Sequence, residues 1–166
     1  MNTINARDIE QGALGDCYFL SALSALAEDP QRIRDLFLTE QTNYAGCYAI
    51  RLFLNGEPRT VAIDDMFPFD DRPERDVWAM GHVTKDWEIW VNICEKALAK
   101  VLGSYEAVEG GKAYQAFSYL TGFPSDYLLH SDYSLDELWT LIFEAAQTNQ
   151  PCTCSVNSLM NGMTKE

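Results

Sequence analysis

One apolar run near the start of the chain limits the folds open to this sequence more than any other feature. It extends from Cys17 to Ala27 (CYFLSALSALA), and its apolar and small residues recur at helical intervals. Alanine and serine side chains are small, so backbone from other elements can approach such a helix closely. Asp16, preceded by Gly15, is a residue type that often begins helices, which would make Cys17 the first helical residue. The run therefore predicts a buried central helix.

An alternating pattern begins at Cys47, where every second residue is apolar up to Leu54. A period of two is typical of a β-strand with one buried face. The dipeptide Asn55-Gly56 follows directly, and this pair forms tight hairpin turns. A second alternating run comes after it, so the sequence predicts a β-hairpin. Residues 64–85 mix prolines, acids and aromatic residues without a steady period, and they predict a long surface loop.

Four other regions carry helical patterns: residues 31–38, 87–102, 114–120 and 134–147. Gly103 and Gly122 are expected to end the second and third of them, because glycine readily adopts the left-handed conformation found after helices. Ser134 and Glu137 form a capping box that would begin the fourth. Residues 151–156 predict one more strand, which would need a sheet to join.

The charge balance narrows the range of partners. Lys and Arg number 12 against 25 Asp and Glu, which gives a net charge of −13 at pH 7. Such a chain repels phosphate backbones and anionic lipid, so we expect no nucleic-acid partner. No apolar run approaches the roughly 18 to 20 residues of a membrane span, and the polar start lacks the core of a secretion signal. The 166 residues are 47% hydrophobic, and they predict a soluble, cytoplasmic protein that forms one compact unit or a large part of one.

The cysteines do not suggest a disulfide framework or a zinc site. They are odd in number and include no C-x-x-C pair: Cys17, Cys47, Cys94, Cys152 and Cys154. A chain of this size folds without covalent crosslinks. Cys152 and Cys154 stand as C-x-C, with no second pair of cysteines or histidines at zinc-ligand spacing.

Cys17 is the residue whose position suggests chemistry. A thiol at the start of a helix lies near unpaired N–H groups, whose partial positive charge favours the thiolate and makes the sulfur a better nucleophile. Gln11 lies six residues earlier in a glycine-containing loop. Its amide and the Cys17 N–H could together stabilise an oxyanion formed when the sulfur attacks a carbonyl. A buried structural thiol is the alternative, and composition alone would favour it.

The surroundings of Cys17 resemble the nucleophile segment of the calpain family of papain-like cysteine proteases, QGALGDCYFLSALSALAE in this chain. Similarity continues in VAIDDMFPF, EIWVNICEKALAKVLGSYEAVEGG and FSYLTGFPSDY, and it covers the chain from Asp8 to about Ser158. The resemblance implies an α+β fold, the helix-rich half of a papain-like protease core, with the cysteine at the N-terminus of the central helix and a small antiparallel β-sheet. Residues 1–150 would form this first subdomain, and residues 151–166 the opening strand of a truncated or missing second subdomain.

The resemblance also assigns roles to individual residues. Cys17 matches the family's nucleophile and Gln11 its oxyanion-hole amide, while Gly110 and Gly111 match glycines that line the substrate cleft. Tyr18 departs from the family, which usually has tryptophan after the nucleophile, although an aromatic wall is kept. Without the family context, the two glycines would simply predict a turn before a helix.

A calcium site is a further implication of the resemblance. Two acidic ligands of the family match Asp8 and Glu88. Carboxylate oxygens suit Ca²⁺, which takes six to eight oxygen contacts, so backbone carbonyls would have to complete the set. The family's long N-terminal arm, which supplies carbonyls, is reduced here to a few residues. Read alone, Asp8 could be a solvated loop acid and Glu88 an acid favoured by the helix dipole.

The imidazole that a cysteine protease requires is not placed where the family has it. Papain-like enzymes carry their histidine and asparagine roughly 130 to 150 residues after the cysteine, whereas His82 and His130 lie nearer and outside the family's Gly-His context. Both are interpreted as surface or packing histidines. The sequence thus predicts a calpain-like, calcium-dependent cysteine endopeptidase module that lacks the His and Asn and is inactive alone.

Two alternatives stay open: a non-catalytic binding or structural module derived from the calpain fold, and a calcium-responsive adaptor. Completed by a second subdomain, the module would act on polypeptide substrates. The face that would otherwise meet that subdomain predicts a protein partner or self-association, because monomers seldom expose large apolar surfaces.

Overall fold

The computed structural model describes residues 4–39, 41–70, 77–78, 80–83 and 88–155. Its α-helices are α1 (Cys17–Ala27), α2 (Pro30–Arg34), α3 (Trp90–Leu102), α4 (Ala113–Thr121) and α5 (Leu135–Gln147). Three single turns of 3-10 helix accompany them, η1 (Ala6–Asp8), η2 (Glu106–Val108) and η3 (His130–Asp132). The arrangement is mixed helix and small antiparallel sheets, which confirms the predicted α+β class.

The strands form three two-stranded antiparallel sheets among the described residues. The long hairpin pairs β2 (Cys47–Leu54) with β3 (Glu57–Asp64) around Asn55-Gly56, both of which have positive φ. The two shorter pairs are β1 (Ile9–Glu10) with β6 (His82–Val83), and β4 (Phe69–Asp70) with β5 (Val77–Trp78). The hairpin is confirmed as predicted, since a turn with two positive φ values favours Asn-Gly.

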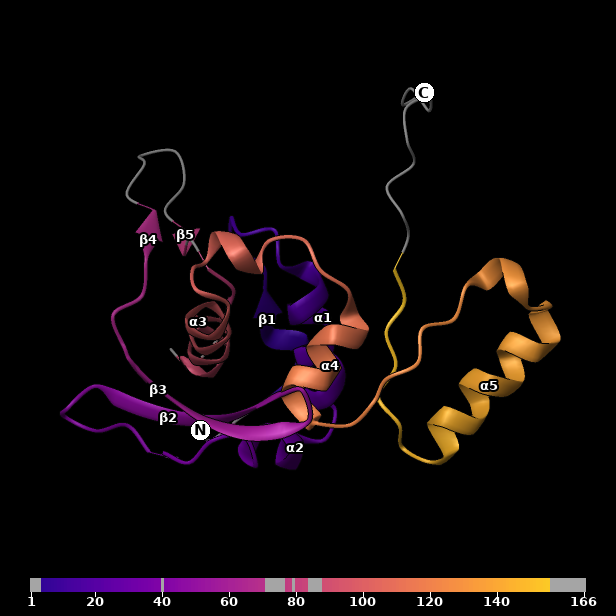
Figure 1. Ribbon diagram of the computed structural model, residues 1–166, viewed down its shortest axis with the longest axis horizontal. Helices are drawn as coiled ribbons and strands as arrows, with labels where there is room; N and C mark the ends of the chain where they lie inside the picture. Colours follow the sequence, from indigo (N-terminus) through magenta and orange to yellow (C-terminus); the bar gives the residue numbers. More distant parts are fainter. Residues whose placement is uncertain (1–3, 40, 71–76, 79, 84–87, 156–166) are drawn as a thin grey trace, which may run out of the picture.

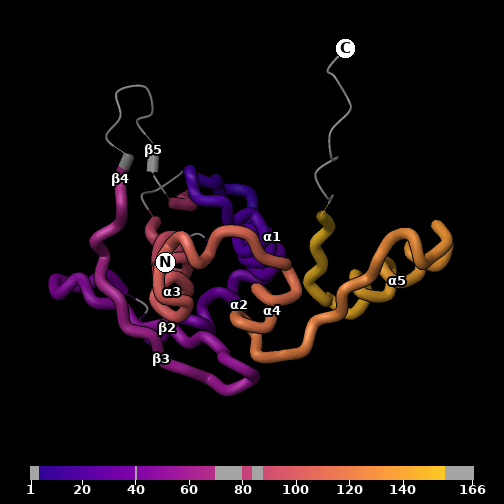
Figure 2. Tube along the Cα trace, turned by 45° about the horizontal axis from the view of Figure 1, so that its top comes forward, coloured from indigo at the N-terminus to yellow at the C-terminus, as the bar shows by residue number. Residues whose placement is uncertain are grey.

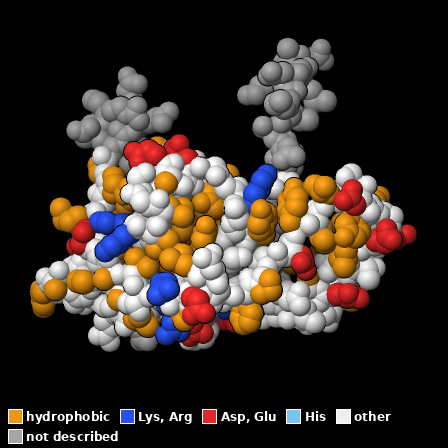
Figure 3. Space-filling model, viewed as in Figure 1, with side chains coloured by type: hydrophobic (Ala, Val, Ile, Leu, Met, Phe, Trp, Pro, Cys, Tyr) orange, Lys and Arg blue, Asp and Glu red, His pale blue; other side chains and the backbone are white. Residues whose placement is uncertain are grey.

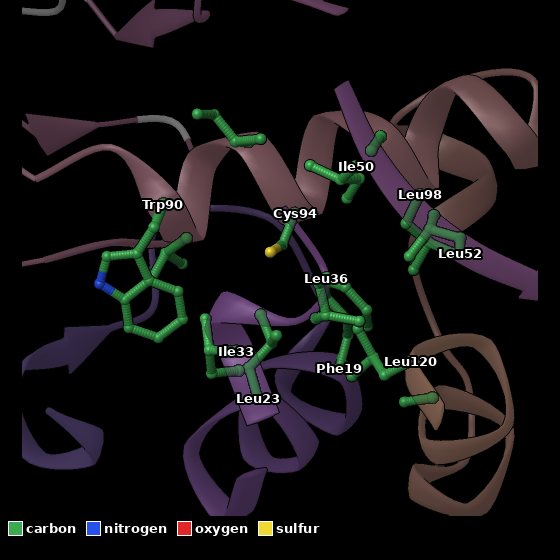
Figure 4. Packing of buried hydrophobic residues seen from close by; sticks show 14 of the residues in the cluster. Phe19, Leu23, Ile33, Leu36, Ile50, Leu52, Trp90, Cys94, Leu98 and Leu120 are labelled. Carbon is green, nitrogen blue, oxygen red and sulfur yellow. The ribbon is translucent and has the colours of Figure 1, made fainter. Parts of the chain in front are cut away.

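The core lies where α1, α3 and α4 meet one another and the inner face of the hairpin (Figure 1). Figure 4 shows Phe19 and Leu23 of α1 close to Leu36, with Cys94 of α3 above them. All but Leu36, which is 4% exposed, are completely buried. Each large apolar side chain removed from water contributes about 1.5 to 3 kcal/mol, so this contact is the main source of stability. The predicted packing of the 87–102 helix on the central helix is confirmed.

The segment after α4 leaves the core. Figures 1 and 2 both show α5 standing to one side of the rest of the molecule, at the end of a long connection. No residue of α5 is buried, although Ser134 and Glu137 form the predicted capping box at its start. Several of its large apolar side chains are more than half exposed: Leu135, Trp139, Ile142 and Phe143. Figure 3 shows hydrophobic side chains gathered over this helix with acidic ones among them.

Helix ends that depend on local residues occur where the sequence predicts them. The central helix spans the predicted residues, and Gly103 and Gly122 end α3 and α4 with φ of 109° and 74°. No helix among the described residues is long and apolar enough to cross a membrane.

Three predicted elements differ from the structure. The helix predicted over 31–38 ends at Arg34, because the Leu36 carbonyl and the Leu38 N–H bond to β2 instead. Residues 64–85, predicted as a loop, contain the short strands β4, β5 and β6. No strand is present over 151–155, because this segment pairs with no other strand in the described part of the chain, and residue 156 lies outside that part.

Candidate active site around Cys17

Cys17 is the first residue of α1, and its side chain is exposed. Two residues later, Phe19 is completely buried and packs this end of the helix into the core. The backbone carbonyl of Asp16 accepts the first helical bonds, from Phe19 at 2.8 Å and Leu20 at 3.2 Å. A sulfur at this position lies beside the positive end of the helix dipole and is accessible from solvent. The prediction that Cys17 begins the central helix is therefore confirmed, and the alternative of a buried thiol is wrong for this cysteine.

The loop before Cys17 is folded by the side chain of Gln11. Its Nε2 donates to the backbone carbonyl of Leu14 at 2.7 Å, and the Leu14 side chain is buried. An amide nitrogen carries two hydrogens, so this bond uses one donor and leaves a second for another acceptor. The bond fixes the side chain within the loop that leads to Cys17. Gln11 is thus anchored in the loop that leads to Cys17, while its role as an oxyanion donor stays a prediction.

Gly110 and Gly111, which follow α3 and η2 in the chain, contact the segment around Cys17. The Gly110 N–H donates to the Gly15 carbonyl at 3.0 Å, and Gly110 has a φ of 69°, which glycine adopts without strain. Gly111 lies against the ring of Tyr18: an added Cβ would be 2.5 Å from Cζ. Only a residue without a side chain fits there. The structure therefore joins the two glycines to the Cys17 segment.

Tyr18 keeps its proton in this setting. Burial raises the pKa of its hydroxyl to about 12, with additional contributions from the charge of Asp16 and from Tyr119. The ring is half-buried and faces the backbone of Gly111, so it acts as a neutral wall. The sequence could not indicate the contact between Tyr18 and Gly111, because the two residues are far apart in the chain and the pattern of each is local.

The predicted calcium ligands, Asp8 and Glu88, lie in the chain near the strands β1 and β6. Asp8 is buried in η1, directly before β1, and the half-buried Glu88 follows β6 by a few residues. Ile9, next to Asp8, pairs with Val83, whereas Glu88 comes five residues after Val83, beyond residues 84–87, which lie outside the described part of the chain. The described residues contain no group of three or more His, Cys, Asp or Glu side chains placed to hold a metal ion. The residue types suit Ca²⁺, but main-chain oxygens would have to supply most of its contacts.

The two histidines lie in separate parts of the fold. His82 is in β6, where its Nε2 is 3.6 Å from a carboxylate oxygen of Glu10. His130 is exposed in η3, on the connection that leads to α5. Neither position is in the loops that surround Cys17.

The other cysteines differ from Cys17 in their surroundings. All five thiols are free. Cys94 is completely buried in the core, and burial raises the pKa of its thiol far above the ordinary range. Cys47, Cys152 and Cys154 are exposed, but none of them begins a helix. Among the described residues, Cys17 is therefore the thiol that combines solvent access with a helix N-terminus.

Comparison with known proteins gives a match over the whole sequence. The family described as calpain family cysteine protease matches residues 1–166. The calpain-type cysteine protease DEK1 of Zea mays is 42% identical over 120 residues, which is 72% of this chain and 5% of that protein. Calpain-A of Drosophila melanogaster is 35% identical over 156 residues, 90% of this chain and 18% of that protein.

The human relative gives a similar result. The calpain-1 catalytic subunit of Homo sapiens is 34% identical over 154 residues, which is 90% of this chain and 21% of that subunit. The chain therefore spans about a fifth or less of the curated relatives that it matches.

Proposed function

This chain belongs to the calpain family of cysteine proteases, and from that membership we propose that it forms the first, Cys-bearing half of a calpain-type endopeptidase core. The observation that carries the proposal is the position of Cys17, exposed at the N-terminus of α1 between the Gln11 loop and the Gly110-Gly111 segment. Polypeptides are the substrate class, and the cell compartment is the cytoplasm.

The reaction that fits this arrangement is acyl transfer to sulfur followed by hydrolysis. The Cys17 thiolate attacks a peptide carbonyl carbon, and the carbonyl oxygen takes on negative charge that the Cys17 N–H and the Gln11 amide would stabilise. The C–N bond then breaks, the amine leaves with a proton, and a thioester remains on Cys17. Water attacks the thioester carbon, the C–S bond breaks, and the acyl group leaves as a carboxylic acid while the thiol is restored. Both the proton transfers and the attack by water require an imidazole base.

We propose that this imidazole and its orienting amide come from a second, β-rich half, so that the chain alone does not turn over peptides. His82 lies beside Glu10 in the β1–β6 pair and His130 is exposed in η3, so neither histidine is part of the segments 11–17 and 110–111 that form the candidate site. Removing one member of a catalytic triad typically lowers kcat by several orders of magnitude. Residues 1–150 would then be the first subdomain and residues 151–166 the start of the second.

The exposed face of α5 supports a partner for this half. Leu135, Trp139 and Ile142 recur at helical spacing, and they are 76%, 69% and 57% exposed. Such a stripe is normally covered in a folded protein. We therefore propose that a second subdomain, another protein or a second copy of this chain binds it. The same observation favours the second candidate function, a binding or structural module that retains the fold without the reaction.

Selective alkylation tests the proposed function. The isolated chain is incubated with a peptidyl epoxide, and the adducts are located by mass spectrometry. We expect Cys17 to be modified at least about ten times faster than Cys47, Cys152 and Cys154, because it alone among them begins a helix and lies beside the Gly110-Gly111 segment proposed to bind the peptide. The Cys17→Ser variant is the control and should lose the fast adduct only. Equal rates at all four exposed thiols would contradict the enzyme proposal and favour the binding module.

Calcium binding is proposed at Asp8 and Glu88, with main-chain oxygens completing the shell. Calcium at 100 times its Kd is expected to raise the free energy of unfolding by about 2.7 kcal/mol, seen as a higher Tm. Asp8→Asn should abolish this rise because it removes one of the two carboxylates. Asp126→Asn, which changes an exposed acid after α4, should retain it. If calcium leaves the Tm of the wild-type chain unchanged, both the calcium site and the calcium-responsive adaptor are ruled out.

A further inference from the structure

Two acidic side chains are completely buried behind the candidate nucleophile. Asp16 directly precedes Cys17, and Glu95 lies in the middle of α3; both are 0% exposed. Taken as carboxylates, neither accepts a hydrogen bond from another side chain in the described part of the chain; the main chain of Gly81 approaches Glu95, and the main chain of Asp16 approaches its own carboxyl group. Buried carboxylates are rarely left in this state, because the loss of hydration is costly unless a partner replaces the water. The proposed chemistry of Cys17 uses neither residue.

The two carboxyl groups are each other's partner. A hydrogen bond links Asp16 to Glu95, which two carboxylates could not form because both are acceptors only. One of them must therefore carry a proton. Burial, the hydrogen bond with Asp16 and repulsion by its charge raise the pKa of Glu95 to about 10, so Glu95 holds the proton at neutral pH. Burial also raises the pKa of Asp16.

This contact changes what Asp16 does at the start of α1. Asp29 and Ser134 precede α2 and α5 with ψ of 100° and 162°, and their side chains accept an N–H of their own helix. Asp16 has a ψ of 26°, and its side chain makes no such bond. The residue type that normally caps a helix is thus turned inward toward α3. The first N–H groups of α1, beside Cys17, are left without the carboxylate cap that they would otherwise have.

We propose that Asp16 and Glu95 share one proton, and that this carboxyl pair positions the nucleophile by holding the Asp16 side chain away from its own helix. The inference rests on the proposed function, since the N–H groups left open are those that would stabilise the oxyanion beside Cys17. Asp16 and Glu95 are positioning residues, because they act through the backbone of α1.

Other ionisable groups face the pair from the elements around it. Tyr18 of α1 and Glu109, after η2, interact with Asp16, while Tyr105 and the neighbouring Cys94 interact with Glu95. The backbone of Gly81 closes the remaining side: an added Cβ there would be 3.2 Å from Glu95 Oε1. No lysine or arginine is among these groups, so a proton is what neutralises part of the charge.

The test compares Glu95→Gln with Glu95→Leu in the whole chain. Glutamine can still donate to Asp16 but has no proton to lose, whereas leucine removes the donor and keeps the volume. Folded Glu95 holds its proton up to about pH 10, and the unfolded side chain loses it above its ordinary value of 4.5. The folded state therefore binds the extra proton across this window, and the wild-type chain loses stability as pH rises through it.

The first readout is Tm between pH 6 and pH 9. Over this pH range, we expect the Tm of the wild-type chain to fall by at least about 5 °C more than the Tm of Glu95→Gln. This readout measures stability alone, so it does not require Cys17 to react. The second readout is the rate of epoxide labelling at Cys17 at pH 7.5. Glu95→Gln should match the wild-type rate within about twofold, and Glu95→Leu should be at least about tenfold slower, which is 1.4 kcal/mol of barrier.

Equal pH slopes for wild type and Glu95→Gln would overturn the shared proton, and this comparison stands even if Glu95→Leu does not fold. Labelling of Glu95→Gln as slow as that of Glu95→Leu would overturn the positioning role. A wild-type chain that is not labelled selectively at Cys17, but shows the expected pH slopes, would instead contradict the proposed function. The two failures are therefore distinguishable.

Discussion

Phe19→Ala is expected to lower the free energy of unfolding by about 3 to 5 kcal/mol, the largest stability effect that we predict. Phe19 is 0% exposed, and in the close-up its ring lies near Leu36, which follows α2, and Leu120 of α4 (Figure 4). Alanine would leave a cavity that close-packed neighbours fill only in part. Urea denaturation followed by circular dichroism measures the change.

The matched control is Phe123→Ala, because Phe123 is 72% exposed. This variant should change the free energy of unfolding by no more than about 0.5 kcal/mol. A Phe19→Ala variant that loses less than about 1 kcal/mol would mean that α1 does not pack as described. The position of Cys17 would then lose its support, since Phe19 holds the same end of the helix.

Gly111→Ala is expected to slow epoxide labelling of Cys17 about tenfold, an increase of about 1.4 kcal/mol in the barrier. The added methyl carbon would be 2.5 to 2.7 Å from three atoms of the Tyr18 ring, so either the ring or the glycine segment must move. Each movement alters the aromatic wall next to the nucleophile. The second-order rate constant for labelling is the measurement.

A double-mutant cycle separates this clash from other effects of the substitution. In Tyr18→Ala/Gly111→Ala the ring is absent, so the cost of the alanine at 111 should largely disappear. Gly15→Ala is the control in the facing loop, because a Cβ there meets Glu109 only at 3.9 Å or more, which is ordinary contact. If Gly111→Ala slows labelling equally with and without Tyr18, the ring contact is not the cause.

Local chemistry accounts for the parts of the fold that the sequence predicts well. Asn55-Gly56 forms the hairpin turn, glycines 103 and 122 end two helices, and Ser134 caps α5. Each of these rests on the preference of one or two residues for a backbone conformation. The end of α2 does not rest on such a local preference, because the carbonyl of Leu36 accepts a hydrogen bond from the Arg51 N–H of the distant strand β2.

The candidate site likewise contains one feature that the local sequence predicts and one that depends on a distant residue. The exposure of Cys17 follows from its place at a helix start, which the sequence indicates. The direction of the Asp16 side chain does not follow from local sequence, because its partner Glu95 belongs to α3. A signal for that partner exists: Glu95 stands between Val91 and Leu98 at the helical spacing of the buried face, where an acid is unusual. The strand expected over 151–156 is absent from 151–155, the part of it that the structure describes, because a strand needs a partner and the pattern of one segment cannot supply it.

The bond from the Gly110 N–H to the Gly15 carbonyl joins two segments of the candidate site that are distant in the chain, so the arrangement proposed around Cys17 exists only in the folded protein. The two segments that it joins are brought together only when α1, α3 and α4 have packed. Unfolding removes both the helix dipole and the facing loop, and leaves an ordinary cysteine side chain. A newly synthesised or damaged polypeptide would therefore carry at position 17 a thiol no different from its other exposed ones, and the selectivity proposed for Cys17 would arise only as the fold matures.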